Sequence, residues 1–157
     1  MTDQDGDPRE YGLDGSGSND SNIESRNMDP VAGLIELSLP ADSRYMRLAR
    51  LMASGVATSS GLPLEEVEDF RIAVDELCAT LIEMGDGDPV RLAFELGTDV
   101  VVVHATTTMS ADAGIDEERL SLSRQILDVV TDGHDLTQDH GRVELMARKV
   151  VRSSGVG

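Results

Sequence analysis

The sequence predicts an α+β fold: a two-layer sandwich in which helices cover one face of a mixed, mostly antiparallel sheet. Two observations lead to this prediction. Apolar residues recur at helical spacing in three segments, and five other segments alternate or form short aliphatic runs. These segments follow one another as strand, helix, helix, strand, strand, helix, strand, strand. That order lacks the regular βαβ alternation of a parallel sheet.

The predicted structure begins with a strand and a helix. The strand is LIELSLP, which alternates and ends at Pro40. Its apolar face consists of Ile35, Leu37 and Leu39. Asp42 or Ser43 can cap the next helix, which is expected to run to about Ser60. The apolar side predicted for this helix consists of Tyr45, Leu48, Leu51, Met52 and Val56.

A second helix is predicted from about Leu64 to Met84, with acids near its start and Gly85 after its end. Its buried stripe consists of Phe70, Val74, Leu77, Leu81 and Met84. VRLAFEL and DVVVVHATT then form two strands around a hairpin turn at Gly97-Thr98.

The last part of the chain is predicted to contain a helix and a hairpin. The helix runs from about Asp116 to Thr131. Its packed face consists of Leu120, Ser123, Ile126, Leu127 and Val130. The hairpin pairs HDLT with RVELMARKV around a turn at residues 138–141.

Composition excludes several classes of function. The 157 residues carry 30 acidic and 13 basic side chains, a net charge of -17, which disfavours direct binding to nucleic acid or to an anionic membrane. A basic protein partner would suit this charge, and so would a role in solubility alone. The single cysteine, Cys78, cannot form an intrachain disulfide. No apolar run resembles a signal peptide or a membrane helix, so a cytoplasmic location is expected.

The chain divides into three parts. Residues 1–30 carry eight acids and two arginines and have little to bury, so they are predicted to be a disordered acidic tail. This tail can be regulatory or merely a solvated extension, and Met28 is an alternative start. Residues 31–152 form the predicted domain, and residues 153–157 a flexible C-terminus. The histidines His104, His134 and His140 lack metal-ligand spacing, so no metal site is predicted.

Three stretches resemble the anti-sigma-factor serine kinases, a bacterial branch of the GHKL (histidine-kinase-like) ATPases. They are LSLPADSRYMRLARLMA, EDFRIAVDELCATLI, and LSRQILDVVTDGHDL followed by HGRVELMARK. The second stretch is the most specific, because it resembles the family's N box. The resemblance implies the two-layer ATPase fold of that superfamily over about residues 34–149.

The N box implies roles for two residues. Glu76 stands at the family's base position, and Thr80 stands where the family has the asparagine that ligates magnesium. Two further elements depart from the family. HATTTMSADAG replaces D-x-G-x-G after the strand, and SLSRQ, at residues 121–125, replaces a glycine pair. We therefore expect no cofactor, although the resemblance by itself implies ATP and magnesium. On the alternative interpretation Glu76 is a half-exposed helical carboxylate, salt-bridged to Arg71 or Arg91.

The resemblance also implies function. It implies an anti-sigma factor that sequesters a sigma factor from RNA polymerase and is controlled by a STAS-type anti-anti-sigma protein. In the family the first helix contacts the sigma factor, so the resemblance implies partner-binding roles for Arg50 and Arg47. Kin of this type pair through the sheet or first-helix region, so a homodimer is expected. The alternatives are an active Mg-ATP-dependent serine kinase that phosphorylates its antagonist, and a scaffold that binds neither sigma factor nor ATP.

Overall fold

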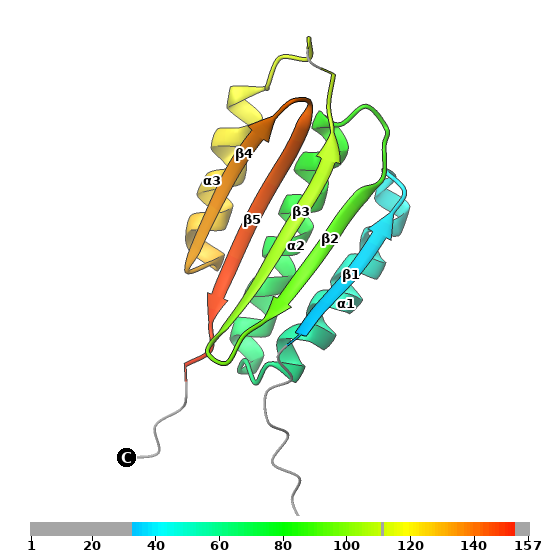
Figure 1. Ribbon diagram of the computed structural model, residues 1–157. Coiled ribbons are helices and arrows are strands. Elements are labelled where there is room, and N and C mark those ends of the chain that lie inside the picture. Colours follow the sequence, from blue (N-terminus) through cyan, green and yellow to red (C-terminus); the bar gives the residue numbers. More distant parts are fainter. Residues whose placement is uncertain (1–32, 111, 153–157) are drawn as a thin grey trace, which may run out of the picture.

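The computed structural model describes residues 33–110 and 112–152, which form one sheet with three helices behind it (Figure 1). The elements are β1 (Gly33–Leu39), the 3-10 turn η1 (Ser43–Tyr45), α1 (Met46–Ser59), α2 (Leu64–Met84), β2 (Val90–Leu96), β3 (Val100–Thr108), α3 (Glu117–Val130), β4 (Gly133–Asp139) and β5 (Arg142–Val150). The predicted order of elements is confirmed. The terminal segments 1–30 and 153–157 lie outside the described residues.

The strands form one five-stranded sheet in the order β1-β2-β3-β5-β4. Each neighbouring pair is antiparallel. The predicted two-layer α+β sandwich is therefore confirmed, but the predicted mixed character is wrong for the described strands. The reason is the connection through α3, which carries the chain from β3 to the edge strand β4, so that β5 returns between them (Figure 1).

Helix α2 is the centre of the helical layer. Its predicted span is confirmed, and its inward residues Phe70, Val74, Leu77 and Leu81 are fully buried. The ring of Phe70 meets Phe94 of β2 edge to face, with a centroid distance of 6.2 Å. Helix α2 therefore packs against the sheet, and this packing positions the middle of the N-box stretch.

The apolar side predicted for the first helix is largely wrong. The buried residues of α1 are Ala49, Ala53, Val56 and Ala57. Leu48 and Leu51 are instead 40% and 69% exposed. Small alanine side chains let α1 approach α2 closely, which turns the leucines away from α2 and toward the outer edge of the layer. The helix therefore presents an apolar surface to solvent.

Two hairpin turns are confirmed. Between β2 and β3, Gly97 donates its backbone N–H to the Val100 carbonyl at 2.9 Å. Between β4 and β5, His140 and Gly141 form a two-residue turn with φ of 47° and 79°. The second turn lies at the end of the sheet where β3 meets the loop to α3, and the Gly141 carbonyl accepts the N–H of Met109 at 2.7 Å.

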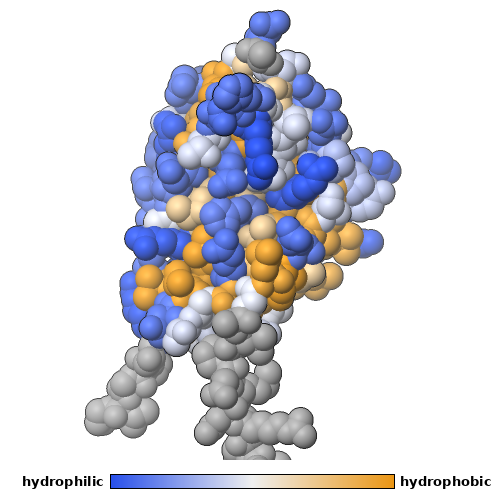
Figure 2. All heavy atoms as spheres, viewed as in Figure 1, coloured by the Kyte–Doolittle hydropathy of each residue, from blue (hydrophilic) through white to orange (hydrophobic). Residues whose placement is uncertain are grey.

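Among the elements that the structure describes, none covers the sheet face opposite the helices (Figure 1). Figure 2 shows this face as hydrophilic in its upper part and more apolar in its lower part. His104 of β3 lies on it, with Nδ1 3.1 Å from Oε1 of Glu144. Across the described segments, no helix is long and apolar enough to cross a membrane.

Candidate functional site

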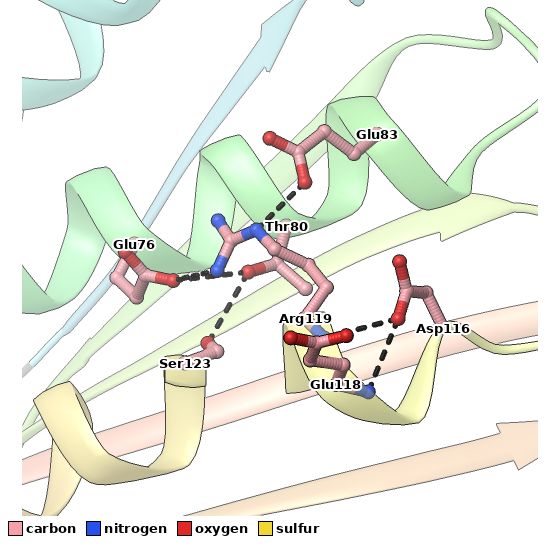
Figure 3. Close-up of polar contacts among 7 residues, drawn as sticks. All are labelled: Glu76, Thr80, Glu83, Asp116, Glu118, Arg119 and Ser123. Atoms are coloured by element: carbon pink, nitrogen blue, oxygen red, sulfur yellow. Dashed lines mark hydrogen bonds and ion pairs between the residues drawn. The ribbon is translucent and has the colours of Figure 1, made fainter. Parts of the chain in front are cut away.

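The two N-box residues lie on one face of α2, directed toward α3 (Figure 3). Thr80 is fully buried, and the Glu76 side chain is 13% exposed. The Thr80 hydroxyl lies 3.4 Å from Oε1 of Glu76 and 3.2 Å from Oγ of Ser123 on α3. Its single proton can be donated to only one of these acceptors at a time. Glu76 and Thr80 therefore lie side by side, and Ser123 of the third helix contacts Thr80.

Arg119 of α3 occupies the other side of Glu76. Its Nη1 lies 2.5 Å from Oε1 of Glu76, and its Nε lies 2.7 Å from Oε2 of Glu83 (Figure 3). The hydrogen bond with Glu76 is the main reason that the pKa of Arg119 is raised, and Glu83 contributes further against the opposing effect of burial. The partner of Glu76 is thus Arg119 rather than Arg71 or Arg91; Arg71 pairs with Glu68 at 2.7 Å.

The start of α3 holds Arg119 in this position. Asp116 caps the helix by accepting the backbone N–H groups of Glu118 and Arg119, each at 3.1 Å. Two turns of α3 then bring Arg119 and Ser123 to the face that packs on α2. The positions of Arg119 and Ser123 against the N box are therefore set by the packing of α3 on α2, by the Asp116 cap and by the ion pair with Glu76.

These residues do not fit a magnesium–nucleotide site. Magnesium needs near-octahedral oxygen ligands and usually keeps several waters. The Thr80 hydroxyl is fully buried against Ser123, and the nearer oxygen of Glu76 already accepts from Arg119. Within residues 33–110 and 112–152, no three His, Cys, Asp or Glu side chains are grouped to hold a metal ion.

Two residues that differ from the family pattern, Thr80 and Ser123, contact each other. Ser123 belongs to the SLSRQ stretch that replaces the expected glycine pair, and Thr80 replaces the expected asparagine. The side chain of Ser123 occupies space that a glycine would leave empty. Its hydroxyl contacts Thr80, the residue at the position of the family's asparagine. The two side chains fill the space between α2 and α3.

The two predicted partner-binding arginines lie on α1, apart from this cluster. Nε of Arg50 lies 2.7 Å and 2.6 Å from the two carboxylate oxygens of Asp75 on α2, and the Arg50 side chain is 44% exposed. Arg47 is exposed, and among the described residues it has no ion-pair partner. Arg50 thus links α1 to α2 through an ion pair.

Arg119 is a residue of this cluster that the sequence does not indicate. A single arginine in the first turn of a helix has no periodic or motif signal, and its partner is 43 residues away. Ser123 had a weak signal, because it is a polar residue on the predicted packed face of its helix. It is 1% exposed, and its hydroxyl contacts Thr80.

Known proteins resemble this chain in sequence. Residues 39–145 match the family described as the histidine kinase-like ATPase domain. The serine-protein kinase RsbW of Bacillus pumilus is 41% identical over 56 residues, which are 36% of this chain and 35% of that protein. RsbW of Bacillus cereus is 28% identical over 95 residues, which are 59% of this chain and 56% of that protein. The chain thus aligns with about a third to just over half the length of these curated relatives.

Two solved structures share the fold. The structure of the RsbU and RsbW domains of Rv1364c from Mycobacterium tuberculosis matches with a TM-score of 0.61 and 12% identity, covering 77% of this chain and 33% of that chain. The SiaB-SiaC complex from Pseudomonas aeruginosa matches with a TM-score of 0.50 and 13% identity, covering 74% and 89%. Because the family match extends over residues 39–145, the chain belongs to the histidine kinase-like ATPase domain family, in which its relatives include the RsbW serine-protein kinases.

Proposed function

We propose that this protein is an anti-sigma factor that works by binding, with little or no ATP-dependent chemistry. It sequesters a sigma factor from RNA polymerase, and a STAS-type anti-anti-sigma protein controls it. The family and the RsbW relatives support this role. The proposal that the protein works without ATP-dependent chemistry rests on one observation, the ion pair between Arg119 and Glu76 in the middle of α2.

This ion pair bears directly on the chemistry. A general base must be within reach of the proton that it takes from the attacking hydroxyl. Oε1 of Glu76 already accepts a hydrogen bond from the charged Arg119 guanidinium at 2.5 Å, so this oxygen is engaged within the chain rather than directed at an attacking hydroxyl. Thr80 stands where the resemblance implies a metal-ligating asparagine, and its buried hydroxyl contacts Ser123 instead. Binding without turnover is therefore the function that this geometry favours.

The partner surface of the proposal is α1. This helix exposes Leu48 and Leu51 together with Arg47, which has no ion-pair partner within residues 33–110 and 112–152. An exposed apolar patch beside a free arginine is typical of a protein-binding surface, because arginine can bind a carboxylate while its stem packs on apolar groups. A contact through Arg50 would require a carboxylate that replaces or joins Asp75.

The alternative function is an active serine kinase. Its support is Glu76, which stands at the position of the family base. It requires Arg119 to swing away when nucleotide binds. It predicts magnesium-dependent ATP binding by calorimetry and phosphotransfer to a STAS-type protein that is lost in Glu76→Gln. Transfer that is unchanged in that variant would remove the assignment of the base.

The test of the main proposal is a pull-down of the tagged full chain from its native cell extract without added ATP, read by mass spectrometry. We expect a stoichiometric sigma factor. Arg47→Glu should reduce its recovery, whereas Arg44→Glu, the same charge change at a side chain that is 80% exposed but paired with Asp42, should not. Recovery of only a STAS-type protein, or of neither, contradicts sequestration.

Three further parts of the proposal have simple tests. A homodimer would give twice the chain mass in light scattering. Cell fractionation would test the proposed cytoplasmic location. Limited proteolysis with intact-mass analysis would test whether residues 31–152 behave as the domain and residues 1–30 and 153–157 as its extensions.

A further inference from the structure

An apolar groove of about 490 Å³ runs between β1 and α1, at the edge of the molecule. Its lining includes Ile35, Leu37, Leu48, Leu51, Met52 and Gly55. It is open to solvent, since Leu51 is 69% exposed and Ile35 is 36% exposed. β1 is also an edge strand of the sheet. An apolar surface of this kind on an otherwise acidic protein indicates a docking site.

Charge restricts what can dock there. Helix α1 carries two arginines and no acid, whereas α2 carries seven acids and α3 three. The net charge of the whole chain is -17. Arg47 lies one turn before Leu51, and it is exposed and without an ion-pair partner within the described segments. The fitting occupant is therefore a short apolar segment flanked by acids.

The chain itself contains such a segment. Residues 10–14 read EYGLD, which places Tyr11 and Leu13 two residues apart between Glu10 and Asp14. We propose that residues 10–14 bind in the groove between β1 and α1, with Tyr11 and Leu13 on the apolar lining and a flanking acid at Arg47. Neither the fold nor the nucleotide-site residues account for this motif.

The connection is long enough for this contact. The 32 residues that precede β1 join it at Gly33, two residues before the first groove residue, Ile35. A Gly- and Ser-containing chain of about 19 residues, such as residues 14–32, has a root-mean-square span of about 24 Å. Helix α1, with 14 residues, is about 21 Å long. Because covalent attachment gives an effective concentration on the order of millimolar, a weak contact is enough.

Docking of this segment would cover the exposed leucines of α1. If the proposed function holds, the segment therefore competes with the sigma factor and lowers its affinity. This consequence rests on the proposed function, but the docking itself does not. A failed competition assay with intact docking would count against the function, whereas absent docking would count against this inference alone.

The first test compares ¹H–¹⁵N and methyl NMR spectra of the full chain with those of Tyr11→Ser/Leu13→Ser. We expect shift changes concentrated at Ile35, Leu48, Leu51 and the rest of the lining. Unchanged spectra at these residues, or changes concentrated elsewhere, would overturn the inference. Circular dichroism of the variant checks that it folds, so that a loss of folding is distinguished from a loss of docking.

The second test identifies the occupant directly. A benzoylphenylalanine placed at position 11 of the full chain should crosslink to peptides of β1 and α1. A mixture of ¹⁴N- and ¹⁵N-labelled chains separates crosslinks within one chain, which we expect, from those between two chains. Mixed-isotope crosslinks would show that a second copy supplies the segment and would overturn the intrachain proposal, as would crosslinks to α3 or their absence.

A matched pair of groove variants completes this test. Leu51→Glu should abolish the crosslink, because it adds a charge to the apolar lining and repels the acidic segment. Val129→Glu on α3, at a residue that is 81% exposed, should leave it unchanged. Circular dichroism checks that both variants fold. An undiminished crosslink in Leu51→Glu would contradict the proposed position.

Discussion

Nη1 of Arg119 lies 2.5 Å from Oε1 of Glu76, and this contact joins the first turn of α3 to the middle of α2. The resemblance to the family's N box implies that Glu76 stands at the base position. Here it faces an arginine of its own chain, and beside it Thr80 faces Ser123. The chain thus supplies its own cation and its own filling side chains at this position.

The first prediction concerns the contribution of this ion pair to stability. Arg119→Met should lower the free energy of unfolding by about 2 kcal/mol, between the values for exposed and fully buried pairs. The reason is that Glu76, whose side chain is 13% exposed, would lose its ion-pair partner. Urea unfolding followed by circular dichroism measures the change.

The control is an arginine on the solvent side of the same helix. Arg124→Met should change stability by less than about 0.5 kcal/mol, because Arg124 is exposed. A double-mutant cycle with Glu76→Gln should give a coupling energy near 1 kcal/mol or more. No coupling would mean that the Arg119–Glu76 contact contributes nothing to folding.

The second prediction concerns Lys149, which extends from β5 toward the N-terminal part of α2. Lys149 is 5% exposed, and its Nζ forms ion pairs with Glu66 and, at 3.1 Å, with Asp69. Lys149→Met should destabilise the fold by about 2 kcal/mol, less than a fully buried pair, because both carboxylates keep some contact with water. Adding Glu66→Gln should recover part of the loss. Additive destabilisation in thermal unfolding would contradict the ion-pair explanation.

The third prediction is a pH dependence that arises from Cys78. Burial, with a smaller contribution from the charge of Asp75, raises the pKa of the Cys78 thiol from 9.0 to about 12. Above pH 9 the unfolded chain loses this proton more readily than the folded one, so stability is full below pH 9 and falls as pH rises toward 12.

Thiol reactivity measures the same environment. A thiol reagent such as DTNB at pH 8 should modify native Cys78 only at the rate of protein opening, because the side chain is 2% exposed and protonated. Modification should be immediate in guanidinium chloride. Cys78→Ala should flatten the fall in stability above pH 9; an unchanged slope would assign it to other groups.

The fourth prediction concerns the hairpin between β4 and β5. His140 adopts a φ of 47°, and Gly141 follows with a φ of 79°. Both central residues of such a turn need positive φ, which asparagine tolerates better than histidine. His140→Asn should therefore raise stability by a few tenths of a kcal/mol and the melting temperature by about 1–3 °C. A lower melting temperature would show that the His140 side chain itself stabilises the turn.

Much of the fold could be predicted because local patterns and packing agree. Local patterns indicate the same elements that the tertiary fold contains. Examples are the alternating strand VRLAFEL, the acid-rich start of α2 and the glycines at the two hairpin turns. The order of strands in the sheet was less accessible. Each connection can be satisfied by more than one antiparallel arrangement until α3 is placed.

The apolar side of α1 shows where local pattern fails. Leu48 and Leu51 have the larger apolar side chains, yet the alanines of the opposite stripe are buried. Which side of a helix packs depends on how closely its neighbour approaches, and small residues permit the closest approach. The sequence shows that α1 is amphipathic but not which of its two apolar stripes contacts α2.

By itself, the sequence determined the α+β class, the eight main elements, the family resemblance and the N-box positions Glu76 and Thr80, because each depends on neighbours within a few turns of chain. Only the tertiary structure decided what those two residues face. Arg119 and Ser123 reach them from 43 residues away, through packing of α3 on α2, and no local pattern encodes that distance. The packing of α1 on α2 through its alanines left the leucines of α1 exposed beside β1, where the groove is formed.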